Sequence, residues 1–299
     1  MKILAKSALA LAIAATTSVP TFAAMGDAPD VTGVTGRFRT LVLCNDDTCN
    51  ETNIAGRFRM AAEQDMGNGN SVFGKFEFAV AQANGVQPTT RLSYVGVKGD
   101  FGSLSLGTRW SPFYNVVVSP VDWSKAFGGT WNSPGTGYSS NFRVSDAVFF
   151  STGGLQTMIQ MTGDDANEDI DQIEVGYSMA LGAATVGIAL NDSETAADTR
   201  VGISAAGNAG SVRLAASYYD QGANSGLLAQ VMAPMGGGTV SLSLGQNMRD
   251  AGAEASMVAV EFDKPLGASS SWFVGVEQND DDAGSDTTVY GAGLHYNFN

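Results

Sequence analysis

Apolar and polar residues alternate along most of this 299-residue chain, and this period of two is the feature that most limits its fold. At 239–244, for example, the apolar residues Val240, Leu242 and Leu244 alternate with hydroxyl-bearing residues. Such alternation places apolar side chains on one face of a β-strand and polar side chains on the other. Because the spacing of amphipathic helices is nearly absent, the chain is predicted to be all-β.

Sixteen alternating runs can be counted, at 33–43, 53–66, 71–82, 89–98, 102–110, 146–152, 155–163, 170–180, 184–191, 199–206, 211–219, 225–233, 239–248, 254–263, 270–278 and 286–298. Short turns rich in Gly or Asn follow the even-numbered runs, whereas longer polar loops follow the odd-numbered runs. Two kinds of connection at the two ends of a sheet are typical of a transmembrane β-barrel, which has an even number of strands. A barrel of this size leaves an aqueous lumen, whereas one of about eight strands is filled by side chains. The pattern therefore predicts a sixteen-stranded antiparallel transmembrane β-barrel with a role in transport.

Composition excludes several other classes of protein. A pI near 4.3 excludes a dominant basic surface for nucleic acid, and a hydrophobic content of 44% argues against a wholly disordered chain. Past residue 24 no stretch of 18 apolar residues occurs, which excludes a bundle of membrane helices. A secreted β-sandwich or lectin-like protein is the soluble alternative, but it requires neither alternating loop lengths nor aromatic residues at strand ends. Such residues are expected here as an interfacial girdle: Trp110, Tyr177, Trp272, Tyr290, Tyr296 and Phe298.

The first 23 residues have the features of a signal peptide. Lys2 and Lys6 precede an apolar core at 8–15, and small residues precede a cleavage site after Ala23. The alternative is a membrane anchor, but the segment is short and lacks a stop-transfer flank. The expected organisation is therefore a signal peptide at 1–23 and one barrel domain at 24–299.

Acidic residues are concentrated in the second half of the chain. Residues 24–163 carry 11 acids and 10 bases, whereas residues 164–299 carry 19 acids and 4 bases. Most of the later acids gather between the β-like runs, including Asp164, Asp165, Asp280, Asp281 and Asp282. Two interpretations remain open: solvated loop tips, or a surface for Ca²⁺ or Mg²⁺, which prefer hard oxygen ligands.

The only two cysteines, Cys44 and Cys49, lie five residues apart. In an exported protein such a pair favours a disulfide across a hairpin. Two thiols without a nearby histidine make a poor zinc site, and free thiols are the third possibility.

The connection from 111 to 145 is far longer than the others. Loops above about 12–15 residues are usually functional or disordered. This one contains Trp123, Phe127, Trp131, Tyr138 and Phe142, with few charged residues. A loop this apolar is expected to lie inside the lumen rather than in solvent.

Three segments resemble the general diffusion porins of the Gram-negative outer membrane, which are sixteen-stranded and trimeric. The stretch 91–107 is similar to the fourth and fifth strands of that family, 73–78 to its third strand, and Phe127-Gly128-Gly129 to its folded-in constriction loop. The resemblance is most specific in 33–150. It implies a water-filled outer-membrane channel for passive diffusion of ions and small hydrophilic solutes, without a cofactor. It also implies a homotrimer, contact with outer-membrane lipid and lipopolysaccharide, and assembly by the barrel-assembly machinery.

The family also implies a pore constriction at which loop acids face a basic cluster on the opposite wall. By motif, Arg37, Arg91 and Arg143 match basic wall positions and Asp122 matches a loop acid, while Ala126 replaces a frequent family glutamate. Alternation adds Arg39, Arg57 and Arg59, and Glu77 is expected as a lumen acid. Any one of these arginines could instead face a neighbouring subunit or a lipid headgroup.

No constellation of catalytic residues is recognisable. The single histidine, His295, is expected to be a lumen or interface side chain, and no serine lies in a nucleophile-elbow motif. An outer-membrane phospholipase is the enzyme alternative. A substrate-specific or chiefly structural barrel is the more serious alternative to a general channel.

Overall fold

The computed structural model describes residues 30–45, 47–53, 55–80, 88–129, 142–162, 170–250, 254–282, 284 and 286–298. The predicted signal peptide at 1–23 lies outside these residues, as do 130–141 of the long loop and the acidic residues Asp164 and Asp165. Within the described ranges, no helix has the length and apolar character needed to cross a membrane.

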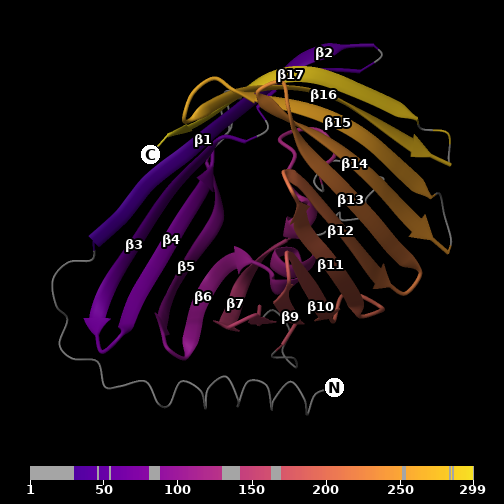
Figure 1. The fold of residues 1–299 in the computed structure, drawn as a ribbon. Coiled ribbons are helices and arrows are strands. Elements are labelled where there is room, and N and C mark those ends of the chain that lie inside the picture. The colour runs from indigo at the N-terminus through magenta and orange to yellow at the C-terminus, as the bar shows by residue number, and fades with distance from the viewer. Residues whose placement is uncertain are drawn as a thin grey trace.

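The strands form one antiparallel sheet that closes on itself, so that the first strand pairs with the last (Figure 1). The elements are β1 (Asp30–Cys44), β2 (Cys49–Asn53), β3 (Arg57–Gly67), β4 (Asn70–Ala79), β5 (Thr89–Gly99), β6 (Gly102–Trp110), η1 (Tyr114–Val118), η2 (Ser119–Val121), β7 (Arg143–Thr152), β8 (Leu155–Gln160), β9 (Gln172–Leu181), β10 (Ala184–Ser193), β11 (Arg200–Ala209), β12 (Val212–Gln221), β13 (Asn224–Met235), β14 (Gly238–Arg249), β15 (Ala255–Pro265), β16 (Ser270–Asp281) and β17 (Thr287–Phe298). Because β2 and β3 both pair with β1, they fill one place in the ring. The barrel thus has the sixteen strand positions that the alternation predicts.

Two details of the expected strand pattern are wrong. The run expected at 53–66 is interrupted, because β2 ends at Asn53 and β3 begins at Arg57, each pairing with a different part of β1. The longer outer connection expected at 220–224 is a turn of two residues, Gly222 and Ala223, with a φ of 57° at Gly222. The strands β12 and β13 extend to this turn because Gln221 pairs directly with Asn224.

Apolar side chains face outward and polar side chains face the lumen, the reverse of a soluble β-protein. On β14, Ser241 and Ser243 are buried, whereas Leu242 and Leu244 are exposed. Tyr177, Tyr290 and Tyr296 are also exposed, as a lipid-facing girdle requires. This polarity allows the barrel to hold water inside while its outer surface contacts hydrocarbon.

Trp110 was expected in that girdle, and this expectation is wrong. Its ring packs inside the barrel, stacked on Tyr114 at a centroid distance of 4.2 Å. Trp110 is the last residue of β6, and the chain turns into the loop directly after it. The alternation of a strand does not have to continue at the point where the strand ends and a loop begins.

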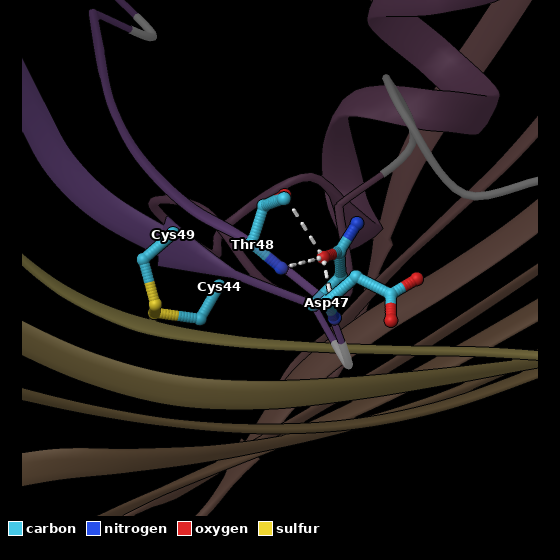
Figure 2. Close-up of a disulfide and its surroundings, with 5 residues drawn as sticks. Cys44, Asp47, Thr48 and Cys49 are labelled. Atoms are coloured by element: carbon cyan, nitrogen blue, oxygen red, sulfur yellow. Dashed lines mark hydrogen bonds between the residues drawn. A yellow bond between two sulfur atoms is a disulfide. The ribbon is translucent and has the colours of Figure 1, made fainter.

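A disulfide joins Cys44 to Cys49, which lie opposite each other in the β1–β2 pairing (Figure 2). Within the hairpin, the side-chain oxygen of Asn45 accepts hydrogen bonds from the backbone N–H of Asp47 at 3.2 Å and of Thr48 at 2.9 Å. Asn and Asp side chains commonly stabilise turns in this way. The disulfide and the turn together fix the connection that follows β1.

Candidate functional site

Residues 111–129 leave β6 and lie inside the barrel, with η1 and η2 against β9–β13 and residues 125–128 against β14–β16 (Figure 1). The segment begins with the π-helical turn η1 and the 3-10 turn η2. Its apolar side chains are almost fully buried against the wall: Phe113, Val116, Val117, Val118, Val121 and Phe127. Because each such burial contributes about 1.5–3 kcal/mol, the loop packs on the wall as a core element would.

Glycines in the wall allow the loop to approach the strands closely. A Cβ atom at Gly187 of β10 would lie 2.6 Å from Val116 Cγ1 and 2.9 Å from the Val116 carbonyl oxygen. A Cβ atom at Gly202 of β11 would lie 2.6 Å from Phe113 Cζ. Ordinary side chains at these positions would therefore displace the loop from the wall.

Buried carboxylates on the strands bind the backbone of the loop. Glu261 accepts hydrogen bonds from the N–H groups of Lys125 at 2.8 Å, Ala126 at 2.7 Å and Phe127 at 3.1 Å. Glu277 and Glu174 accept the N–H groups of Gly128 and Phe113, each at 2.7 Å. Hydrogen bonds to a charged acceptor contribute about 1.5–3 kcal/mol each, so these acids hold the loop along its length.

The three anchoring glutamates were not identified from the sequence. Each occupies a position in its strand whose side chain faces the lumen. Glu261, for example, lies between Val260 and Phe262, which face outward. The signal that could have found them is an acidic residue at a lumen position within a strand, rather than in a loop.

The opposite wall carries a cluster of arginines around Glu77 of β4. Arg59 Nε lies 2.5 Å from Glu77 Oε2, Arg91 Nε 2.7 Å from Oε1, and Arg57 Nε 4.0 Å from Oε1. Arg37 stands opposite Arg57 in the β1–β3 register. Three strands, β1, β3 and β5, thus bring four guanidinium groups to the side of the lumen where β4 carries one carboxylate.

Trp110 links this arginine cluster to the loop. The guanidinium carbons of Arg143 and Arg91 lie 5.6 Å and 5.8 Å from the centre of its ring, within range of a cation–π contact. The ring also stacks on Tyr114, as described above. The base of the loop is therefore fixed to both walls of the lumen.

Asp122 lies on the loop side of the lumen. The hydroxyl of Tyr114 donates a hydrogen bond to its carboxylate at 2.8 Å. Burial, together with the charge and hydrogen bond of Asp122, raises the pKa of the Tyr114 phenol, so the phenol keeps the proton that it donates.

Arg39 connects the loop to β17, the last strand of the barrel. Its Nε donates to His295 Nδ1 at 3.1 Å, its Nη1 donates to the Lys125 carbonyl, and it interacts electrostatically with Asp122. The structure thus places all eight residues of the expected constriction inside the lumen, with Asp122 on the loop and the other seven on the strands of the wall. Their role in permeation stays a prediction.

The sequence matches the family model for Gram-negative porins over residues 8–299. The chain belongs to the Gram-negative porin family. It is an outer-membrane channel for passive diffusion, built as a multi-pass β-barrel. No curated protein matches the sequence significantly.

Solved porin structures share the fold at low sequence identity. OmpT of Vibrio cholerae, in its trimer form, is 16% identical, with a TM-score of 0.71 over 91% of this chain and 100% of that one. OmpF of Salmonella typhi in complex with daunomycin is 14% identical, with a TM-score of 0.68 over 89% and 97%. A triple mutant of the Rhodopseudomonas blastica porin is 14% identical, with a TM-score of 0.69 over 89% and 99%.

Among the described residues of this porin, no three His, Cys, Asp or Glu side chains gather in a way that could hold a metal ion. Asp280 and Asp281 end β16, and Asp282 follows them at the outer end of the barrel. Binding of divalent cations by the acidic loops stays a prediction, since Asp164 and Asp165 lie outside the described residues.

Proposed function

We propose that the narrowest part of this porin lies between the loop segment 113–127 and the arginine cluster of β1, β3, β5 and β7. Ions and small hydrophilic solutes would diffuse through it down their gradients, without a cofactor and without catalysis. The observation that carries the proposal is the anchoring of the loop inside the lumen, by Glu174, Glu261 and Glu277, opposite the arginines.

Charge on the two sides of the constriction supports a preference for polar solutes. Asp122 on the loop and the arginines on the wall produce a field across the path of the solute, which orders water. An apolar solute would have to displace that water without replacing its interactions. The field and the fixed loop together would set both the size limit and the polarity limit of the channel.

The contacts of His295 support a positioning role rather than a catalytic one. Its Nδ1 accepts the hydrogen bond from Arg39, which itself binds the loop. In the described part of the chain, the histidine thus holds an arginine at the constriction. This argues against the phospholipase alternative.

We also infer a homotrimer, because the Vibrio cholerae relative has a trimer form and a similar fold. Contact with lipopolysaccharide and assembly by the barrel-assembly machinery follow from the outer-membrane location. Mass photometry in mild detergent tests the trimer, and a population of monomers alone would contradict it without affecting the barrel.

Single-channel conductance in planar bilayers tests the channel itself. A general diffusion channel is expected to carry current that rises with salt concentration and that no single small solute blocks completely. Complete block by one solute would indicate a substrate-specific channel instead. The absence of current from correctly folded protein would indicate a chiefly structural barrel.

A further inference from the structure

We propose that the constriction prefers anions, and that its arginine cluster transiently binds oxyanionic solutes such as carboxylates and phosphates. This inference rests on the proposed constriction and names the class of solute that it favours.

The charge balance at the constriction is strongly positive. Its residues comprise six arginines but only two acids, Glu77 and Asp122. Ala126 contributes no carboxylate, and residues 130–141 of the loop carry no charged side chain. Four acids from the second half of the chain also contact the loop inside the lumen: Glu174, Glu261, Asp263 and Glu277.

The acids that do face the lumen are already bound by protein groups. Glu77 is in contact with arginines, and its side chain is only 2% exposed. On the opposite wall, Glu261 and Glu277 are buried and bind backbone N–H groups of the loop, and Asp263 forms an ion pair with Lys125. These carboxylates are thus already paired with protein groups, which weakens their attraction for a passing cation.

The guanidinium groups, in contrast, remain partly accessible and crowd one another. The side chains of Arg57 and Arg59 are 16% and 29% exposed. Arg37 interacts electrostatically with Arg39, Arg59 and Arg91, and its buried Nε–H has no hydrogen-bond acceptor among the described residues. Glu77 is the acid in contact with Arg57, Arg59 and Arg91. One carboxylate does not balance three guanidinium groups, so a negative solute beside them relieves repulsion between like charges.

The geometry of guanidinium favours oxyanions in particular. Its planar set of donors matches carboxylate and phosphate groups through paired hydrogen bonds. Several guanidiniums from adjacent strands can share one such solute. Chloride accepts N–H hydrogen bonds but has no pair of oxygens to match the guanidinium donors, so an oxyanion should remain longer in the constriction.

The acidic outer loops act in the opposite direction but at a greater distance. Dissolved salt screens the interaction between exposed charges that lie more than about 10 Å apart at 0.1 M, or more than about 3 Å apart at 1 M. The loops should therefore enrich cations at the mouth mainly in dilute salt. The partly buried arginines are screened less, so the anion preference should be clearest at high salt.

The first test is the reversal potential of the wild-type channel in a potassium chloride gradient centred near 1 M. A lumen potential of only about half of kT/e favours chloride over potassium by about threefold, and a permeability ratio of at least about that size is expected. The double variant Arg37→Ser/Arg57→Ser should lower the ratio to about one. Arg249→Ser, which removes a cation at the outer end of β14, is the matched control and should leave the ratio unchanged.

The second test uses inorganic phosphate as the probe and needs only wild-type protein for its main result. Millimolar phosphate added at constant chloride should reduce the current or increase its noise, and the double variant should lose this effect. A wild-type channel that prefers potassium at 1 M, or shows no response to phosphate, would overturn the inference while leaving diffusion intact. A barrel that passes no current would overturn the proposed function as well.

Discussion

The hydroxyl of Tyr114 lies 2.8 Å from the carboxylate of Asp122 and donates a hydrogen bond to it across the turns η1 and η2. The ring of Tyr114 also stacks on Trp110, which lies between the loop and the arginines. One side chain therefore fixes the position of the loop acid relative to the basic wall.

Replacing Tyr114 with phenylalanine should keep the stacking and remove this hydrogen bond, at a cost of about 1.5–3 kcal/mol for a bond to a charged acceptor. Asp122 would then sample several rotamers, and the single-channel current should become noisier with less than about a twofold change in mean conductance. Tyr290→Phe, on the exposed outer face, is the control. Equal noise in the two variants would contradict a positioning role for Tyr114.

Replacing Gly187 with leucine should push the loop away from β10, because a Cβ atom there already overlaps Val116. Overpacking of this kind costs about 1–3 kcal/mol, and the displaced loop should narrow the lumen and lower the conductance. Ala205→Leu, at an exposed position that pairs with Val186, adds the same side chain on the lipid-facing surface. Its conductance should equal that of the wild type, and a loss shared by both variants would indicate a general folding defect.

Replacing Glu261 with glutamine should weaken the anchoring of the loop, because one of the two side-chain oxygens that accept N–H groups becomes an amide donor. The loss of charge-assisted hydrogen bonds is expected to cost about 1.5–3 kcal/mol for each bond. Proteolysis near 125–127 should become faster in folded protein, as followed by mass spectrometry. Glu254→Gln, at the exposed start of β15, should not change the rate.

Replacing Ala126 with glutamate should move the reversal potential towards cations, and the shift should persist at high salt because the new charge lies in the constriction. Replacing Asp280, Asp281 and Asp282 with asparagine should move the reversal potential towards anions only in dilute salt, because concentrated salt screens the charges of these exposed loops. If Ala126→Glu leaves the reversal potential unchanged at every salt concentration, this side chain lies away from the solute path.

Protein isolated from cells should contain the Cys44–Cys49 disulfide. Alkylation without a reductant should leave the intact mass unchanged, whereas reduction first should add two alkyl groups. For a loop this short the chain-entropy model gives a stabilisation of about 2 kcal/mol, so Cys44→Ser/Cys49→Ser should remain folded. Alkylation of unreduced protein at two sites would show that the thiols are free.

The barrel could be predicted from the sequence because lipid outside and water inside impose the same alternation on every strand. The apolar loop could also be placed in the lumen, because Phe127 and its neighbours require burial. The anchors could not be predicted, since Glu261 follows Lys125 by 136 residues and only the closed barrel brings them together. Trp110 was misplaced because it is the last residue of β6, where the chain turns into the loop and its ring stacks on Tyr114.

The anchoring of the loop by β15 and β16 has a consequence for biogenesis. The residues that narrow the channel are synthesised early, but Glu261 and Glu277, which hold them, are among the last fifth of the chain to be made. The filter cannot reach its final shape until these late strands are in place. The constriction is therefore completed late in assembly, close to the pairing of β17 with β1 that closes the barrel.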